Sequence, residues 1–397
     1  MEKGQLLHRR LSLICCILFY ISYFEIKKMK ILNLLLVIIF TANNSFAQMD
    51  LPPNGGNPRA TISEEVGITS ISIKYSRPDV NKREGKLFGD GNTVPYGFKE
   101  QNLFTGKNDA PWRAGANEAT SITFEHDVQV EGKDIKAGTY ALFMAMGADN
   151  VTLVFSSQSE TWGTFSYDEK EDVLRVNVKS VVLDKTVEWL KYEFIEYKEN
   201  SCTIAMQWEK VSVPFKVTVD VDNIIVNSLR KEMTGRKSFT PALILQAAQY
   251  CLNKNINLEE ALTWGIKAIT GPGGQKTYIT LRNLAVAYEK LKRIPLADST
   301  MNEALLIATA NQYTAYARQL ITQKRTDKAM EVLEASKKRY GDIYTVNLGL
   351  MMVYSAKADY KNALKHAERA LALATNDGAK KQLEGNIAKL KEGKDIN

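Results

Sequence analysis

The sequence contains few of the residues from which metal centres and many enzyme sites are built. Only three histidines and four cysteines occur among its 397 residues, and no group of them has the spacing of a metal site. We therefore predict no metal site and no cofactor. Beyond residue 47 the remaining cysteines are Cys202 and Cys251, which we expect in different domains. Each is expected as a small buried thiol rather than as half of a disulfide.

The sequence also lacks an apolar run that is long enough to cross a membrane comfortably, which takes roughly 20 residues. Its two apolar runs, residues 11–24 and 31–40, both lie near the start of the chain. The second has the three parts of a secretory signal, namely Lys30, an apolar centre and small residues that end at Ala47. We interpret residues 1–47 as a leader, with translation starting at Met29 and cleavage before Gln48. The alternative is a membrane anchor that uses both runs.

Export through a cleaved leader predicts a periplasmic or extracellular protein without a stable membrane span. The leader also accounts for much of the positive charge. Its six basic and two acidic residues contribute +4 to the net charge of +7, so the remaining chain carries only +3. Because nucleic-acid binding usually needs a clustered basic face, we predict no nucleic-acid partner.

Between residues 48 and 222 the apolar residues recur at every second position, which is typical of strands with one buried face. The alternation is clearest from Val211 to Val221, a run that includes Pro214, which favours an edge position or a bulge. Glu131 and Gly132 form part of a hairpin signal. About nine short strands without intervening helices predict an antiparallel β-sandwich.

Residues 77–116 form a long connection that is rich in glycine and proline. Connections of this length are uncommon and often functional. Near its end Trp112, Arg113, Asn117 and Glu118 offer an aromatic face, a bidentate cation, an amide and a carboxylate, a set that can hold a sugar or a peptide. The alternative is a structural corner in which Arg113 pairs with Glu118 and Trp112 fills the core of the sandwich.

Several short motifs in this half resemble one bacterial family. They are Tyr-Ser-Arg-Pro at 75–78, Val-Pro-Tyr-Gly at 94–97, Trp-Arg-Ala-Gly-Ala-Asn-Glu-Ala-Thr at 112–120, Gly-Thr-Tyr at 138–140, Trp-Gly at 162–163 and Val-Pro-Phe-Lys at 213–216. Together they are similar to the family catalogued as domain of unknown function 2911, over about residues 59–269. The resemblance implies export and a β domain, and it supplies no reaction and no catalytic residues. This chain is longer than the commoner form between Gly97 and Trp112.

The candidate ligand site is completed by four more residues that lie in or beside these motifs. They are Tyr75, Arg77, Trp162 and Tyr167. We therefore expect a glycan or peptide ligand to be bound by aromatic and charged side chains of the β half.

The apolar period becomes that of a helix after Pro241, a residue suited to the first turn. Four sets of residues then repeat with internal offsets of 9, 4 and 3, and their first members lie 36, 32 and 34 residues apart. The sets are Leu252, Ala261, Gly265 and Ala268; Tyr288, Ala297, Met301 and Ala304; Leu320, Ala329, Leu333 and Ser336; and Tyr354, Ala363, Ala367 and Ala370. This spacing matches the 34-residue tetratricopeptide period, and it predicts a solenoid of helix pairs over 241–391.

The predicted organisation is therefore α+β in separate domains. A leader (1–47) precedes the β-sandwich domain (48–222), a linker (223–240), the tetratricopeptide-like solenoid (241–391) and a short tail (392–397). Arg282, Glu289 and Arg318 occupy positions that face the groove in such repeats, so we name them as candidates for binding a protein partner.

The sequence favours binding over catalysis. Our first hypothesis is an exported envelope protein that acts as a non-catalytic binding or scaffold module. The alternative is a secreted hydrolase or isomerase with a carboxylate site near Glu118, which requires a second acid across a cleft. A purely structural envelope protein is the third hypothesis. His126 and His366, the histidines beyond the leader, are both expected at the surface.

The leader makes a direct prediction about the mature protein. Amino-terminal sequencing of the exported form should begin at Gln48-Met49-Asp50, because the small residues before Gln48 form the cleavage site. A protein that keeps residues 11–40 and remains in the membrane fraction would contradict this and would support the two-segment anchor.

Overall fold

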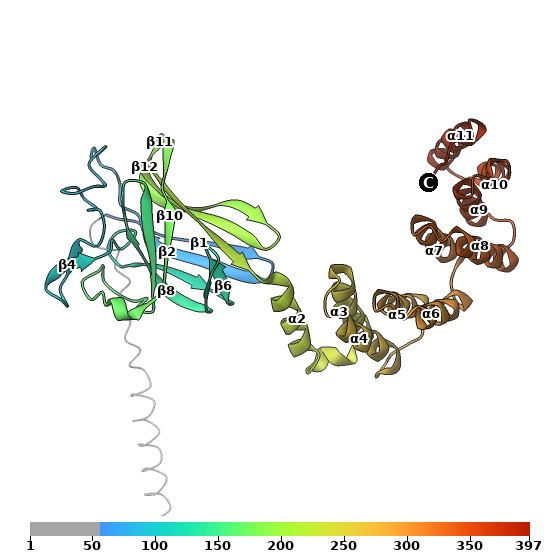
Figure 1. Cartoon of the computed structure of the whole chain (residues 1–397), viewed down its shortest axis with the longest axis horizontal. Helices are drawn as coiled ribbons and strands as arrows, with labels where there is room; N and C mark the ends of the chain where they lie inside the picture. Colours follow the sequence, from blue (N-terminus) through green and yellow to red (C-terminus); the bar gives the residue numbers. More distant parts are fainter. Residues whose placement is uncertain (1–55) are drawn as a thin grey trace, which may run out of the picture.

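The structure is a computed structural model that describes residues 56–397, in which a strand-rich part is joined to an arc of paired helices (Figure 1). This division confirms the predicted combination of an amino-terminal β part and a carboxy-terminal tetratricopeptide-like array. The predicted leader, residues 1–47, lies outside the described residues. Within 56–397, no helix has both the length and the apolar composition that a membrane crossing requires.

The β part contains two main antiparallel sheets. The larger sheet has the strand order β1-β2-β5-β8-β9-β10 and the smaller one has the order β11-β12-β6-β7. Their strands are β1 (Arg59–Val66), β2 (Thr69–Ser76), β5 (Thr120–Phe124), β6 (Val128–Val130), β7 (Lys133–Ile135), β8 (Gly138–Ala145), β9 (Asn150–Ser156), β10 (Asp172–Lys179), β11 (Val181–Lys198) and β12 (Ser201–Val219).

One buried cluster lies between these two sheets, as expected for a sandwich. Ile73 and Phe124 of the larger sheet belong to it together with Met206 and Trp208 of the smaller sheet. Phe155 of β9 meets Phe215 of β12 with ring centroids 6.4 Å apart. The apolar alternation read from the sequence therefore marks the faces that the two sheets turn toward each other.

The long connection predicted at 77–116 contains a short hairpin of β3 (Glu100–Asn102) and β4 (Lys107–Ala110). It and the segment after β9 cover part of the outer face of the larger sheet. A second small core forms there from Ala110, Ala119, Ala141, Phe143, Val154 and Tyr167. Because of this cover, β8 is buried on both faces from Tyr140 onward.

Three features near the end of the β part follow from local chemistry. Glu131 and Gly132 both have positive φ, as the tight turn between β6 and β7 requires. Pro214 lies in β12 beyond the residues that pair with β11 and before those that pair with β6, so it interrupts neither ladder. Strand β12 ends at Val219 rather than at Val221, because Asp220 caps the following helix by accepting a hydrogen bond from the Asn223 N–H.

The stretch 223–240, predicted as a linker, is largely helical. Most of it belongs to α2 (Val221–Glu232) and to a short 3₁₀ turn at Arg236–Phe239. Val226 of α2 is fully buried in one cluster with residues of the first helix pair. The connection therefore packs as part of the array rather than running free between the two parts.

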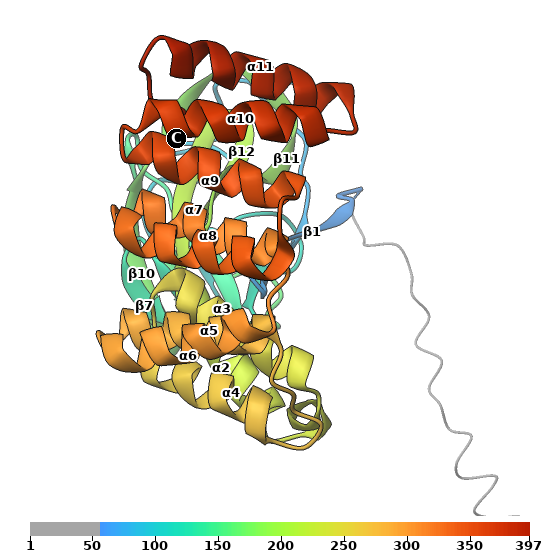
Figure 2. The same cartoon turned by 90° about the vertical axis from the view of Figure 1, so that its right-hand side faces the viewer.

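The helices after α2 form successive pairs, and Figure 2 shows them stacked one above another. The pairs are α3 (Pro241–Lys254) with α4 (Leu258–Thr270), α5 (Tyr278–Lys290) with α6 (Ile294–Leu306), α7 (Ala310–Thr322) with α8 (Thr326–Tyr340), and α9 (Tyr344–Ala356) with α10 (Tyr360–Leu373). A last helix, α11 (Asp377–Lys391), follows and ends where the predicted solenoid ends.

The repeated small residues lie where they were predicted, at the contacts within and between pairs. In each set the first residue lies on the first helix of a pair and the other three lie buried on the second helix. Ala261, Ala329 and Ala363, which are equivalent members of three sets, are completely buried. Small side chains at these positions let the helix backbones approach closely.

The tail, residues 392–397, folds back onto the array. The Ser355 hydroxyl donates to the Asp395 carboxylate at 2.6 Å, and the Asn397 amide donates to the Met352 carbonyl at 3.0 Å. Cys202 and Cys251 are free and buried, as predicted.

Gly349 of α9 lies close to the side chains of the third helix pair. A Cβ at this position would lie 2.4 Å from Leu333 Cδ2 and 3.0 Å from Thr314 Oγ1, whereas a Cβ at Gly385 of α11 would meet nothing within 4 Å. We expect Gly349→Ala to destabilise the array by about 1–3 kcal/mol, because buried Leu333 must move. Gly385→Ala should instead stabilise it by about 0.5–1 kcal/mol. Thermal unfolding followed by circular dichroism at 222 nm compares the two; equal shifts in Tm would contradict the packing described for α9.

Candidate functional site

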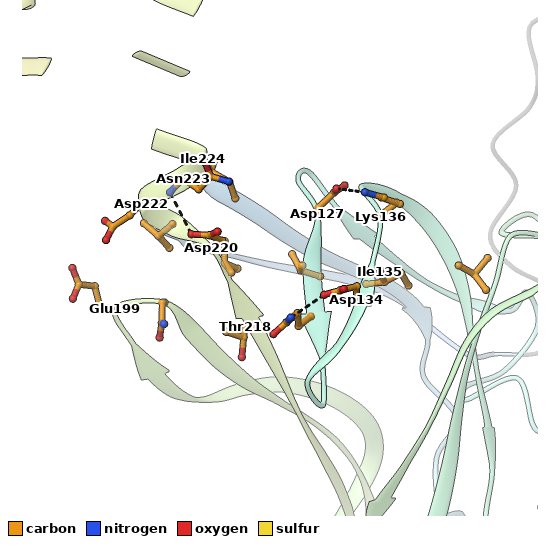
Figure 3. A pocket seen from close by; sticks show the side chains of 16 residues that line it. Asp127, Asp134, Ile135, Lys136, Glu199, Thr218, Asp220, Asp222, Asn223 and Ile224 are labelled. Carbon is orange, nitrogen blue, oxygen red and sulfur yellow. Dashed lines mark hydrogen bonds and ion pairs between the residues drawn. The ribbon is translucent and has the colours of Figure 1, made fainter. Parts of the chain in front are cut away.

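One hollow, of about 890 Å³, lies between the β6–β7 hairpin, the end of β12 and the start of α2 (Figure 3). Its lining is acidic, with Asp127, Asp134, Glu199, Asp220 and Asp222. Most of these carboxylates already have structural partners. Asp127 pairs with Lys136 at 2.8 Å, Asp134 accepts from the Gln129 amide at 2.8 Å, and Asp220 caps α2.

The other two carboxylates hold the first helix pair, Glu199 from the β part and Asp222 from α2. Asp222 accepts a hydrogen bond from the Tyr250 hydroxyl at 2.6 Å, and Glu199 forms an ion pair with Lys254 of α3. Burial is the main cause that raises the pKa of Tyr250, and the hydrogen bond to Asp222 is the second. The Tyr250 hydroxyl therefore remains a donor at neutral pH. Among residues 56–397 no group of three acidic, histidine or cysteine side chains is placed to hold a metal ion. Because all five acidic side chains of its lining are bonded to protein groups, this acidic hollow is a structural junction.

A second cleft, of about 450 Å³, lies on the outer face of the larger sheet beside Trp162. Its floor carries side chains of β2, β5 and β8, namely Lys74, Ser76, Ser121 and Thr139. Its walls are Arg59 of β1, Glu118 and Ala119 before β5, and the loop from Ser159 to Trp162 after β9. Tyr75, Glu118 and Trp162 are the predicted ligand-site residues that this cleft brings together.

The two walls of this cleft are connected through the backbone. The Ala119 N–H donates to the Thr161 carbonyl at 3.0 Å, which fixes Trp162 next to Glu118. The next residue, Gly163, has a φ of +66°, and a Cβ there would lie 2.9 Å from the Arg113 guanidinium. Glycine suits this turn over Arg113, because its φ is strained for other residues, and the turn leaves 53% of Trp162 exposed.

Glu118 is held as a carboxylate. It forms an ion pair with Arg59 and accepts a hydrogen bond from the Ser76 hydroxyl at 3.3 Å. Burial alone would raise the pKa of Glu118, but hydrogen bonds from its own backbone N–H, Arg59 and Ser76 hold the pKa below its ordinary value. At neutral pH its oxygens are therefore acceptors only.

The predicted structural pairing of Arg113 with Glu118 is wrong, because the partner of Glu118 is Arg59. Arg113 instead donates to the Asn117 carbonyl at 3.2 Å and lies over the Phe165 ring. Burial lowers the pKa of Arg113, and the charge of Glu100 partly offsets this. Arg113 thus packs beneath the loop that carries Trp162, and it does not line the cleft.

Three further candidates are components of the core. Trp112 is only 4% exposed and stacks on Trp208 with ring centroids 5.9 Å apart. Tyr167 is equally buried, and its hydroxyl donates to Asp172 at 2.7 Å. The Arg77 guanidinium donates to the Leu190 carbonyl at 2.9 Å, which ties the end of β2 to β11.

Tyr75 and Asn117 also make structural contacts. The Tyr75 hydroxyl accepts a hydrogen bond from the Tyr192 N–H at 3.2 Å, and the Tyr75 side chain belongs to the core between the sheets, although the residue also lines the cleft. Asn117 has a φ of +60° and places its side chain toward Asn57. Both residues shape the corner before β5.

The sequence analysis missed several residues of the cleft: Arg59, Lys74, Ser121, Ser159 and Glu160. Lys74 and Ser121 are outward positions of alternating strands, and this signal was present in the sequence. Their proximity depends on β2 pairing with β5, with Lys74 directly opposite Ser121. Glu160 supplies the second carboxylate in the cleft that the hydrolase alternative requires, although it is exposed at the rim.

The three partner-binding candidates lie on the first helices of their pairs. The Arg282 guanidinium donates to Gln319 at 3.3 Å, and Glu289 accepts from Gln323 at 3.3 Å, so both link α5 to α7 or to the residue after it. Arg318 contacts Met352 Sδ at 3.7 Å. Arg318 also lines a cleft of about 440 Å³ formed by α7, α9, α11 and the tail.

The Arg59–Glu118 pair predicts a pH-dependent contribution to stability. Because the folded-state pKa of Glu118 is lowered, its contribution is present above the unfolded pKa of about 4.3 and is lost as pH falls through the folded value. We expect Arg59→Gln to lower the Tm at pH 7, and the difference from the wild type to vanish at the acidic end of a titration. Differential scanning calorimetry across pH 3–7 measures it; a difference that is constant with pH would contradict this assignment.

No curated protein matches the chain. Similar solved structures include a tetratricopeptide repeat protein from Parabacteroides merdae, 15% identical, with a TM-score of 0.30 over 44% of this chain and 70% of that one. A chain of the APC/C hetero-tetramer Cut9–Hcn1 is 19% identical, with a TM-score of 0.29 over 44% of this chain and 33% of that one. MamA AMB-1 is 13% identical, with a TM-score of 0.25 over 38% of this chain and 85% of that one.

The β part, which holds the cleft beside Trp162, matches one family model. The match ends before the helical array, so it is shorter than the resemblance read from the sequence, which continued to Ile269. Residues 57–217 match the family described as protein of unknown function (DUF2911), as the sequence motifs predicted.

Proposed function

We propose that this protein is exported to the cell envelope and acts as a non-catalytic scaffold whose helical array binds an extended segment of a partner protein. The observation that carries this proposal is the cleft between α7, α9 and α11, because a segment of the chain itself lies against it. Ile396 and Asn397 line this cleft together with residues of the three helices. In Figure 1 the chain end marked C lies on the side of α7 and α9.

The contacts of the tail resemble those that a bound peptide would make. The Asn397 amide donates to the Met352 carbonyl at 3.0 Å, and the Ile396 N–H donates to the Ser355 hydroxyl at 3.1 Å. Ile396 also packs against the apolar cluster of α9, α10 and α11. The tail is thus held by the apolar side chain of Ile396 and by hydrogen bonds of the residues on either side of Ile396.

The side chains that line the cleft indicate what kind of segment fits. Tyr344, Leu348 and Met352 provide an apolar surface that suits a branched or aromatic side chain. Arg318, Gln382 and Asn386 surround it with donors. Methionine adapts to side chains of different shape, so this surface favours an apolar residue flanked by acceptors over one fixed sequence.

Binding is favoured over catalysis because neither described histidine lies in a nucleophile–base arrangement that a substrate can reach. His126 hydrogen-bonds Thr69 at 3.1 Å, but Thr69 is completely buried. His366 is half-buried rather than at the surface, where it bonds Asn347 at 2.8 Å and stacks on Tyr354. Burial lowers the pKa of His366, which keeps the ring neutral within this packing.

The proposal is tested with peptides selected on the mature protein from a displayed random library, with affinities measured by fluorescence anisotropy. We expect Leu348→Glu to weaken binding at least about tenfold, because it puts a charge on the apolar surface. Leu296→Glu, at a position on α6 that is 50% exposed and outside the cleft, is the matched control and should bind normally. Removing residues 395–397 should strengthen binding, because the tail then no longer competes.

Two results would refute the proposal. One is a set of selected peptides whose affinities respond equally to Leu348→Glu and Leu296→Glu. The other is a truncated protein, still folded by circular dichroism, that binds the same peptides more weakly than the full chain does.

A further inference from the structure

We propose that the cleft beside Trp162 is a binding site for an uncharged saccharide. This site lies in the β part, so it stands independently of the peptide-binding function proposed for the helices. The inference rests on three properties of the cleft: a floor of polar side chains, one exposed tryptophan in a fixed loop, and a balanced set of charges.

The floor of the cleft excludes a peptide that binds by adding a strand. It is formed by β2, β5 and β8, which are interior strands of the six-stranded sheet. The backbone of β5 is paired with β2 on one side and with β8 on the other, so no ladder is open to a ligand. A ligand on this floor meets only side chains, mainly the Lys74 ammonium and the hydroxyls of Ser121 and Thr139.

Trp162 provides the apolar contact. It is 53% exposed, whereas Trp112, Trp208 and Trp264 are at most 6% exposed. An exposed tryptophan beside polar groups suits a ligand with an apolar face and hydrogen-bonding edges, and the C–H face of a pyranose ring has this character. The loop is held by the Ala119–Thr161 hydrogen bond and by the turn of Gly163 over Arg113, so little order has to be gained on binding.

The polar groups around Trp162 divide into a fixed set and an unpartnered set. Glu118 is bonded to both Arg59 and Ser76, which form the fixed set with it. Within the described part of the chain, the side chains of Lys74, Ser121, Ser159 and Glu160 form no hydrogen bond or ion pair with protein groups. These four residues offer donors and acceptors that a ligand rich in hydroxyl groups can satisfy.

The charges of the cleft favour an uncharged ligand. Arg59 and Lys74 are cations, and Glu118 and Glu160 are anions, so the lining carries no net charge. A phosphate or a polyanion would meet two carboxylates, and a polycation would meet two cations. The volume of about 450 Å³ lies within the roughly 300–1,000 Å³ of small-ligand sites, enough for a short oligosaccharide.

The test uses the mature full-length protein and a panel of neutral oligosaccharides of glucose, mannose, galactose and N-acetylglucosamine. Binding is measured by isothermal titration calorimetry, and contact with Trp162 by protection of its fluorescence from acrylamide. We expect at least one oligosaccharide to bind and Trp162→Ala to weaken its binding at least about tenfold. Trp189→Ala is the matched control, because Trp189 is 37% exposed on β11 and outside the cleft.

A second variant tests the floor independently of the loop. Lys74→Met keeps the length of an exposed side chain and removes its donor, and we expect it to weaken binding severalfold without changing the Tm. The proposal is overturned if no oligosaccharide of the panel binds at millimolar concentration, or if Trp162→Ala and Trp189→Ala have equal effects. Release of new reducing ends by the wild type, abolished by Glu118→Gln, would replace it with the hydrolase alternative.

Discussion

The organisation of the β part depends on one constraint, which is that the outer face of the six-stranded sheet is covered over only part of its area. The segments around β4 and Tyr167 bury Ala141, Phe143 and Val154 in a second small core. Toward β2 the cover ends, and the sheet presents Lys74 and Ser121 instead. Because a sheet needs only one buried face to be stable, the second face is free to carry a site.

The edge of this cover is where the cleft forms, and its composition follows from that position. The residues under the cover are small or apolar, while those beyond it carry hydroxyl or charged groups. Trp162 lies at the boundary because Gly163 turns the chain back over Arg113. The buried Arg113 is compensated by the Asn117 carbonyl and the Phe165 ring, so the loop is supported from inside rather than by the ligand.

In the helical array the corresponding constraint is the close approach of the helices. Fully buried alanines within the pairs and Gly349 between pairs fix the distance between neighbouring helices. With this spacing, side chains of α7 and α9 line one cleft, and Leu348 and Met352 contribute apolar groups to it. The tail covers a part of that surface, which lowers the area of exposed apolar groups.

Features that depend on local periodicity could be predicted from the sequence. The alternation of apolar residues before Val219 is the period of a strand, and it predicted the β half. The offsets of 9, 4 and 3 after Pro241 are those of paired helices, and they predicted the helical half. The start of α2 was missed because Val221 continues the alternation of β12. Only the carboxylate of Asp220, which caps the helix, marks the change.

The cleft could be predicted only in part, because its members come from distant positions. Glu118 has an arginine five residues away in the sequence, yet it pairs with Arg59, which is 59 residues away. Trp112 and Trp162 are both followed by a glycine within three residues, so this local signal does not tell them apart. One tryptophan is buried and the other is exposed because of how their loops fold over the sheet. This depends on tertiary structure and cannot be read from the neighbouring residues.

The acidic hollow between β12 and α2 joins the part that holds the proposed saccharide site to the part that holds the proposed peptide site. Asp222 and Glu199 hold Tyr250 and Lys254 of α3, while Asp220 starts α2 directly at the end of β12. Only Asp220 separates β12 from α2, so the array continues from the sheet through a capped helix. A saccharide held at the sheet and a peptide held at α7, α9 and α11 would therefore be bridged by packed elements rather than by a loose tether. Such a connection suits a protein that positions one ligand relative to the other, and this is the role of a scaffold.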